Sequence, residues 1–319
     1  MDFTNPDYLV TTEWLADHLD QSDVRILDVT AKLTSKLENR AEAECYQDSH
    51  IPGSLFFDVP AGKGVLSSQE DALPWMWPSP DEVVATLAAV GVGPETKVVL
   101  VARTPREGID SGTMWCTRAW WTLHHYGVDC AILHGGIERW EAEGRALTDA
   151  TSTIPEAAPF VPIPGWEAAT ATKDDVLAAV HGRACLVDAL PADSFDGSGT
   201  SYGPRSGHIT GAVNVPYRSL IKAETSAFVD PASMHAQLAD AGLLDASNVI
   251  TYCGGAIAAT VDAFALALFD KTDVAVYDGS LMEWTTDAEL PMTNPSSASC
   301  TAAHSAPWEQ PAGPGLLGL

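Results

Sequence analysis

The sequence predicts an α/β protein of two tandem domains, each with a parallel sheet between helices. Its 319 residues are enough for about two domains at roughly 150 residues each. Apolar residues make up 46% of the chain and charged residues 19%, a composition typical of globular protein. Short apolar runs alternate with longer amphipathic stretches, and this alternation is typical of parallel sheets covered by helices.

An internal duplication carries the two-domain prediction. Three motifs recur in the same order, namely the strand ends at Asp28 and Asp188, the histidine turns at His50 and His208, and the glycine-to-tryptophan segments 135–140 and 279–284. The offset between the copies falls from 158 residues at the histidines to 144 at the last motif. The first domain therefore carries extra chain after its histidine.

The chain divides into four predicted parts. The first domain covers residues 1–147 and the second covers residues 167–293. The proline-rich stretch 148–166 between them lacks helical or strand periodicity, as expected of a semi-extended linker. The Ser, Ala, Pro and Gly content of residues 294–319 cannot build a core, so a flexible tail is predicted there.

Local patterns predict individual elements in chain order. Residues 81–90 place apolar side chains at helical spacing, after the start signal Pro80 and before the stop signal Gly91, and predict a helix. The apolar runs 98–101 and 249–252 predict buried strands at equivalent places in the two halves. A cysteine, a loop of small residues and a further helix follow the second of these runs.

Charge and cysteine content narrow the functional class. The 17 basic and 43 acidic side chains leave a formal net charge of −26, which repels phosphate backbones and anionic lipid, so neither nucleic acid nor membrane is expected as a partner. No signal-peptide pattern opens the chain, and the nearly apolar stretch 256–269 is too short to span a bilayer, which predicts a cytoplasmic protein. Six cysteines without a CxxC pair argue against a disulfide framework or a zinc site.

The segment around Cys253 is the strongest candidate site. A thiol between a buried strand and the first amides of a helix lies where backbone N–H groups and the helix dipole favour negative charge. This setting predicts a lowered thiol pKa and a thiolate nucleophile. Gly254 and Gly255 would let the backbone curl around the sulfur, and Ala256 and Ala258 would leave room for a ligand. On local sequence alone, a buried structural cysteine is equally compatible.

Over about residues 8–292 the chain resembles the tandem-domain rhodanese family, the thiosulfate and 3-mercaptopyruvate sulfurtransferases. The resemblance rests on the duplicated motifs and on the segment DGSLMEW at 278–284. It implies a five-stranded parallel sheet in each domain and a catalytic cysteine, Cys253, in the second domain only. Ala102 aligns with Cys253 in the first domain, which is therefore expected to be catalytically silent.

The resemblance also implies a reaction and its partners. The Cys253 thiolate would take a sulfane sulfur from a small-molecule donor, become a persulfide, and pass the sulfur to cyanide, a thiol or a thioredoxin-like acceptor, with neither a cofactor nor a metal ion. The loop expected to cradle the donor consists of Gly254, Gly255, Ala256, Ile257 and Ala258. Thiosulfate or a related donor is expected. 3-Mercaptopyruvate is the alternative donor, and a persulfide-carrying or protein-binding module without turnover is the alternative of another class.

Two anion-binding features of the family are missing. Thiosulfate-preferring members usually carry basic residues directly after the cysteine, where this chain has glycine. Mercaptopyruvate enzymes carry an arginine about six residues after the second-domain aspartate, where this chain has Ser194. Arg205, three residues before His208, is the candidate replacement, although a solvent-exposed arginine on a flexible Gly/Ser loop is the favoured interpretation. Phosphatases of this fold need an arginine six residues after the cysteine to clamp phosphate, and Ala259 at that position argues against phosphatase chemistry.

The other candidate residues are expected to be structural. His50 and His208 recur in both halves, including the silent one, so they should stabilise turns. The recurring Asp28 and Asp188 should bind loop amides. The tryptophans at 75 and 77 fall in the extra chain of the first domain, where packing is favoured over lining an interdomain cleft.

Overall fold

The computed structural model describes residues 1–105 and 112–295 and contains two parallel sheets of five strands. The strand order is β1-β5-β4-β2-β3 in the first sheet and β6-β11-β10-β7-β9 in the second. Equivalent strands occupy the same places in both sheets, so the sequence duplication is repeated in the topology. The predicted fold class is confirmed.

The elements have the following bounds. The first sheet contains β1 (Leu9–Val10), β2 (Val24–Asp28), β3 (Leu55–Phe56), β4 (Lys97–Val101) and β5 (Cys130–Leu133). The second contains β6 (Thr170–Ala171), β7 (Cys185–Asp188), β9 (Val213–Asn214), β10 (Val249–Tyr252) and β11 (Val274–Tyr277), and a separate antiparallel pair joins β8 (His208–Ile209) to β12 (Met292–Thr293). The α-helices are α1 (Thr12–Asp17), α2 (Pro80–Ala89), α3 (Gly112–His125), α4 (Gly136–Ala142), α5 (Lys173–Val180), α6 (Ala192–Phe195), α7 (Pro231–Asp240), α8 (Ala259–Leu268) and α9 (Ser280–Trp284). The short helices are η1 (Pro6–Tyr8), η2 (Glu42–Tyr46), η3 (Trp166–Ala169) and η4 (Tyr217–Leu220).

Local sequence accounts for the limits of α2. The Ser79 hydroxyl accepts a hydrogen bond from the Glu82 amide at 3.4 Å, and the Glu82 carboxylate accepts one from the Ser79 amide at 2.7 Å, which together form a capping box. Pro80 suits the first turn, because its missing N–H would have had no helical partner. The helix predicted over residues 81–90 is therefore confirmed, shifted by one residue.

The central strands are buried on both faces. Every residue of β10 is buried, as is every residue of β4 except Lys97. Helices cover both sides of the sheets, which explains why these strands read as unbroken apolar runs. The strands predicted over residues 98–101 and 249–252 are confirmed.

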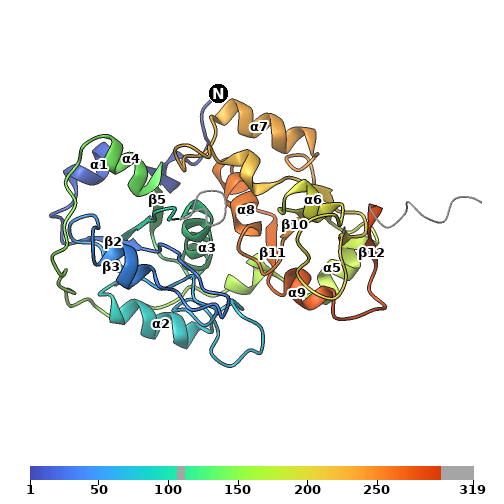
Figure 1. Cartoon of the computed structure of the whole chain (residues 1–319), viewed down its shortest axis with the longest axis horizontal. Coiled ribbons are helices and arrows are strands. Elements are labelled where there is room, and N and C mark those ends of the chain that lie inside the picture. The colour runs from blue at the N-terminus through green and yellow to red at the C-terminus, as the bar shows by residue number, and fades with distance from the viewer. Residues whose placement is uncertain (106–111, 296–319) are drawn as a thin grey trace, which may run out of the picture.

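The two domains meet through α3 and α8, which lie side by side between the sheets (Figure 1). The Thr117 and Thr260 hydroxyls are hydrogen-bonded across this junction at 2.9 Å. The Trp120 ring meets the Phe264 ring edge-on, with centroids 4.7 Å apart. Buried apolar residues of both domains belong to one cluster, so the domains share a hydrophobic core.

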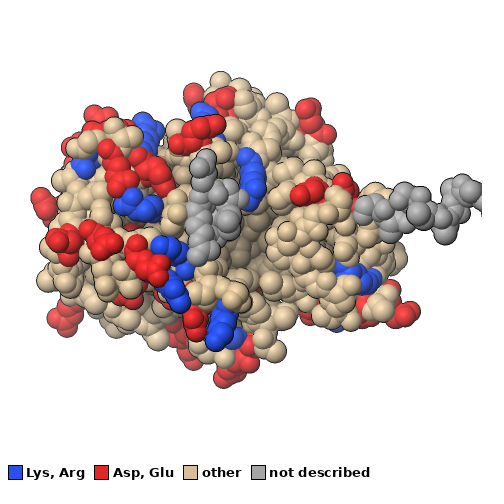
Figure 2. All heavy atoms as spheres, viewed as in Figure 1, with Lys and Arg blue, Asp and Glu red and all other residues tan. Residues whose placement is uncertain are grey.

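Acidic side chains are distributed over both domains on the face drawn in Figure 2. This distribution is in keeping with the net charge of −26. Within the described residues, no helix combines the length and the apolar character needed to cross a bilayer. The tail predicted from residue 294 falls outside the described residues from residue 296 onward.

Candidate active site

Cys253 lies directly after β10, the middle strand of the second sheet, and shortly before α8. The residue is 2% exposed. The backbone amides of Ala259, Gly255 and Ile257 donate hydrogen bonds to its sulfur. The predicted sequence of strand, cysteine, loop and helix is present, and the loop surrounds the sulfur with N–H groups that can hold a negative charge.

Burial dominates the acidity of this thiol. Removal from water raises the pKa of Cys253 above its ordinary value, and the charge of Asp188 adds to this shift. The amides of Ala259, Gly255 and Ile257 act in the opposite direction and do not cancel it. The predicted lowering of the thiol pKa is therefore wrong for this enclosed geometry. Formation of the thiolate depends on other groups that stabilise negative charge at the sulfur.

Three residues around the loop adopt left-handed backbone angles that side chains other than glycine disfavour. Ala256 has φ +59°, Ser280 has φ +47° and Trp75 has φ +60°. Such strain costs about 1–3 kcal/mol per residue and persists where surrounding contacts impose it. The Ala256 side chain is completely buried, so it does not leave the room for a ligand that the sequence suggested.

The two glycines after the cysteine are needed for close approach and not for unusual φ angles. A Cβ atom on Gly254 would lie 2.1 Å from the Tyr202 ring. A Cβ atom on Gly255 would lie 3.1 Å from the Trp75 ring. The two aromatic rings thus cover the loop, one from each domain.

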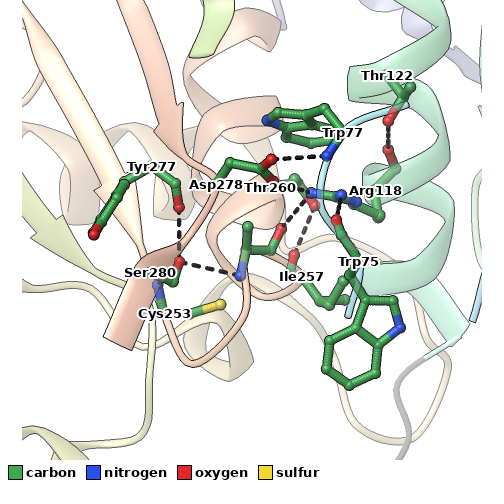
Figure 3. A network of polar contacts seen from close by, with 11 residues as sticks. Trp75, Trp77, Arg118, Thr122, Cys253, Ile257, Thr260, Tyr277, Asp278 and Ser280 are labelled. Carbon is green, nitrogen blue, oxygen red and sulfur yellow. Dashed lines mark hydrogen bonds and ion pairs between the residues drawn. The ribbon is translucent and has the colours of Figure 1, made fainter. Parts of the chain in front are cut away.

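Ser280, the first residue of α9, holds the loop from within its own domain (Figure 3). Its hydroxyl accepts hydrogen bonds from the Cys253 amide at 3.2 Å and the Ala256 amide at 3.1 Å, and it donates to the Tyr277 carbonyl at 2.8 Å. The amide of the next residue, Leu281, donates to the Cys253 carbonyl at 3.1 Å. The duplicated glycine-to-tryptophan segment therefore serves to shape the cysteine loop, a role that sequence reasoning missed.

Arg118 of α3 brings the first domain into direct contact with the loop (Figure 3). This arginine is 1% exposed. Its guanidinium donates to the carbonyls of Ala256, at 3.3 Å, and Trp75, forms an ion pair with Asp278 at 3.6 Å, and lies 3.3 Å from the centroid of the Trp77 ring. Both tryptophans thus lie at the junction of the domains, where they pack around this cation.

The buried pair of Arg118 and Asp278 brings together two opposite charges, each of which burial disfavours. Burial raises the pKa of Asp278 to about 6, although Arg118 and the Trp77 amide, a 2.7 Å hydrogen-bond donor, oppose this rise. Burial lowers the pKa of Arg118 to about 10, while the charges of Asp278 and Cys253 act to raise it. A positive charge is therefore kept directly behind the cysteine loop.

Arg205, predicted to bind the anionic part of the donor, instead holds the end of the second domain. Its guanidinium donates to four backbone carbonyls at 2.5–3.1 Å, those of Trp284, Thr285, Asp287 and Leu290. A guanidinium has five N–H donors, so most of its capacity is occupied by the protein itself. This arrangement leaves the guanidinium little capacity for a substrate anion, and the substrate-binding role stays a prediction.

The turn histidines are structural, as predicted. His50 contacts the Tyr46 carbonyl through Nδ1 at 2.7 Å and stacks on the Tyr46 ring. His208 contacts the Phe195 carbonyl through Nδ1 at 2.7 Å and stacks on the Phe195 ring. The same local arrangement therefore recurs in both domains.

The recurring aspartates bind loop amides, also as predicted. Asp28 accepts from the Thr30 amide at 3.0 Å, and Asp188 accepts from the Leu190 amide at 2.9 Å. The strand register pairs Asp28 with the last residue of β4 and Asp188 with the last residue of β10. Ala102, the next residue after β4, thus occupies the position of Cys253 in the first domain.

Two other cysteines, Cys116 of α3 and Cys130 of β5, lie inside the first domain. Cys116 and Cys130 are buried, and burial raises the pKa of each well above its ordinary value. The cysteines within the described residues, at 45, 116, 130, 185 and 253, are all free thiols. Cys300 lies outside the described residues.

Comparison with known proteins agrees with this geometry. The family described as Rhodanese-like domain matches residues 11–143 and 172–287. The chain is 32% identical over 293 residues to the 3-mercaptopyruvate sulfurtransferase of Escherichia coli (strain K12), covering 89% of this chain and 97% of that protein. It is 30% identical over 285 residues to the thiosulfate sulfurtransferase of Rattus norvegicus, covering 86% of this chain and 91% of that protein.

A solved structure supports the same assignment. The crystal structure of SseA from Escherichia coli, described as a 3-mercaptopyruvate sulfotransferase, aligns with a TM-score of 0.73 at 29% identity, over 86% of this chain and 98% of that one. The fold and the site define a tandem rhodanese-domain protein, and the chain belongs to the rhodanese-like family. It is a sulfurtransferase of the thiosulfate or 3-mercaptopyruvate type, EC 2.8.1.-.

Proposed function

We propose that this sulfurtransferase carries the transferred sulfur as a persulfide on Cys253. The observation behind the proposal is the position of the thiol, at the end of the middle strand with the amides of Ala259, Gly255 and Ile257 directed at its sulfur. These N–H groups can stabilise a thiolate before the transfer and a persulfide anion after it.

The reaction has two half-steps. With thiosulfate, the Cys253 thiolate attacks the outer sulfur, the S–S bond of the donor breaks, and sulfite leaves with the bonding electron pair. An acceptor such as cyanide then attacks the terminal sulfur of the persulfide. Thiocyanate leaves, and the thiolate is restored.

For the donor, the loop chemistry supports 3-mercaptopyruvate ahead of the thiosulfate expected from the sequence. Residues 254–258 carry no positive charge, and Arg205 is occupied by backbone carbonyls. Thiosulfate brings two negative charges to the site, whereas the carboxylate of 3-mercaptopyruvate brings one. The 32% identical relative named as a 3-mercaptopyruvate sulfurtransferase supports the same order.

Arg218 is the residue we propose for the carboxylate of this donor. It is exposed on η4, and its Nε donates to the Tyr217 hydroxyl at 2.9 Å. Its charge acts to lower the pKa of Tyr202, while the charge of Cys253 acts to raise it. Tyr202 covers the loop at Gly254, so the electrostatic effect of Arg218 on Tyr202 supports a role for this arginine near the loop.

Parallel assays test the function and the donor. Wild type and Cys253→Ser are given each donor with cyanide, and the protein mass is measured after donor alone. We expect wild type to gain the mass of one sulfur atom and to turn over, with a higher kcat/KM for 3-mercaptopyruvate, and Cys253→Ser to do neither. Sulfur loading without turnover would favour the persulfide-carrying module. A fully active Cys253→Ser would overturn the assignment of the thiol.

A further inference from the structure

We propose that Arg118, in the domain that lacks the cysteine, is a positioning residue for the catalytic loop. It fixes the Ala256 carbonyl and keeps a buried positive charge behind the Cys253 sulfur. The proposal rests on the function proposed for Cys253 and adds a second domain to the catalytic machinery.

The first part of the argument is the orientation of one peptide group. The Ala256 carbonyl and the Ile257 N–H belong to the same trans peptide and point in opposite directions. Arg118 holds that carbonyl on the α3 side at 3.3 Å, and the Ile257 amide donates to the Cys253 sulfur. A carbonyl fixed toward the guanidinium therefore directs an N–H at the thiol. Ala256 has φ +59°, so the backbone next to this peptide group is held in a conformation that non-glycine residues disfavour.

The second part is charge. The titratable groups that interact electrostatically with Cys253 include Asp188 at the end of β7, Tyr202 in the loop before β8, Tyr252 of β10, and Arg118 of α3. Of these four, Arg118 is the one that is cationic, and it attracts the thiolate. Asp278 faces the guanidinium at 3.6 Å and offsets part of its charge. The loop itself carries no cation, so this charge comes from the other domain.

The third part is how firmly the guanidinium is held. The Trp77 ring lies against one face, the Trp75 and Ala256 carbonyls accept its N–H groups, and Asp278 pairs with it (Figure 3). A planar fork with several donors suits this set of partners, and the single point charge of a lysine does not. Because the side chain is 1% exposed, it acts through the loop and does not contact the donor.

The test compares Arg118→Lys and Arg118→Met with Arg103→Met. The control removes a first-domain arginine paired with Glu141 at 2.8 Å, which contacts neither the loop nor α8 in the interactions described above. The readouts are the pH at which iodoacetamide alkylation of Cys253 is half-maximal, and kcat and KM for 3-mercaptopyruvate. Arg118→Met should raise the alkylation midpoint by about one pH unit, which slows alkylation at pH 7 about tenfold. Arg118→Met should also lower kcat by about tenfold or more with little change in KM. The alkylation midpoint of Arg118→Lys should lie between those of wild type and Arg118→Met.

The control should match wild type. A folded Arg118→Met protein with the wild-type midpoint and kcat overturns the proposal. If wild type fails to take up sulfur from either donor, the proposed function fails, yet the alkylation midpoints still decide the role of Arg118.

Loss of the arginine leaves Asp278 buried without its cation, which can prevent folding. The double variant Arg118→Met/Asp278→Asn removes both charges and retains an acceptor for the Trp77 amide. It is measured alongside the single variant. A raised alkylation midpoint in the folded double variant supports the proposal, and a wild-type midpoint overturns it.

Discussion

The hydroxyl oxygen of Ser280 lies 3.2 Å from the amide nitrogen of Cys253 and accepts its hydrogen bond. The same oxygen accepts from Ala256, so one side chain of α9 binds the start and the bend of the loop. Ser280 itself lies in the left-handed region, with φ +47°. The shape of the cysteine loop is therefore set by a residue that touches the backbone of the nucleophile and not its sulfur.

Ser280→Ala should loosen the loop. The substitution leaves the buried amides of Cys253 and Ala256 without an acceptor, and an unsatisfied buried group costs about 1–3 kcal/mol. We expect the free energy of unfolding in urea to fall by about that amount and kcat to fall, because the amides near the sulfur are no longer held in place. Ser35→Ala, at an exposed position, is the control and should change neither. A Ser280→Ala protein as stable and as active as wild type would contradict this role.

The reactivity of Cys253 should rise steeply with pH. Burial raises the pKa of the thiol, so the thiolate fraction at pH 7 is small and increases as the pH climbs. The rate of iodoacetamide alkylation should have its midpoint above the ~8.5 of a free thiol. Cys253→Ser corrects for reaction at other cysteines. A midpoint at or below the free-thiol value would show that the amides outweigh burial.

Substitution of Arg205 should affect stability, and substitution of Arg218 should affect substrate binding. Arg205→Met removes the donor from four backbone carbonyls, so we expect unfolding at a lower urea concentration, with KM for 3-mercaptopyruvate unchanged. Arg218→Met should raise that KM about tenfold, since a charge-assisted hydrogen bond is worth about 1.5–3 kcal/mol. It should leave the urea midpoint close to wild type. The reverse pattern would return substrate binding to Arg205.

Asp262 in α8 should destabilise the protein at neutral pH. Both of its carboxylate oxygens are buried without a hydrogen-bond partner among the described residues, and burial raises its pKa well above the ordinary value. A carboxyl whose pKa is raised by folding contributes stability below its unfolded pKa and loses that contribution as the pH rises through its folded pKa. Asp262→Val should therefore gain about 1–3 kcal/mol at pH 8.

The gain should be smaller at pH 4, where the wild-type carboxyl is protonated in the folded state. Urea unfolding at both values measures the difference. Asp240→Val, at an exposed position, should show no comparable dependence on pH. Equal gains at pH 4 and pH 8 would mean that packing, and not ionisation, explains the effect.

Sequence reasoning succeeded where the determining contacts are local or repeated. The duplicated strand ends at Asp28 and Asp188 predicted the sheets, and the order of strand, cysteine and helix predicted the surroundings of Cys253. The predicted lowering of the pKa of that thiol was wrong. The sequence shows that a helix begins after Cys253, but it does not show that Tyr202 and Trp75 cover the cysteine loop.

The contacts of two arginines could not be predicted, for one physical reason. The place of Arg205 near His208 suggests a role toward the substrate, but its partners are carbonyls about 80 residues later, which no local pattern predicts. Arg118 was overlooked, since it lies 138 residues before the Ala256 carbonyl that it holds. Only the packing of α3 against α8 brings it there.

The ion pair between Arg118 and Asp278 also bears on how a duplicated protein divides its working parts between the two copies. Immediately after a duplication either copy can lose its functional residues, because the other copy retains all of them. Here the cation lies in one copy and the thiol in the other, so in the proposed arrangement each copy supplies a part that the other does not. A domain without the catalytic cysteine would thus still contribute to the site, and substitutions along the face of α3 that meets α8 should lower activity.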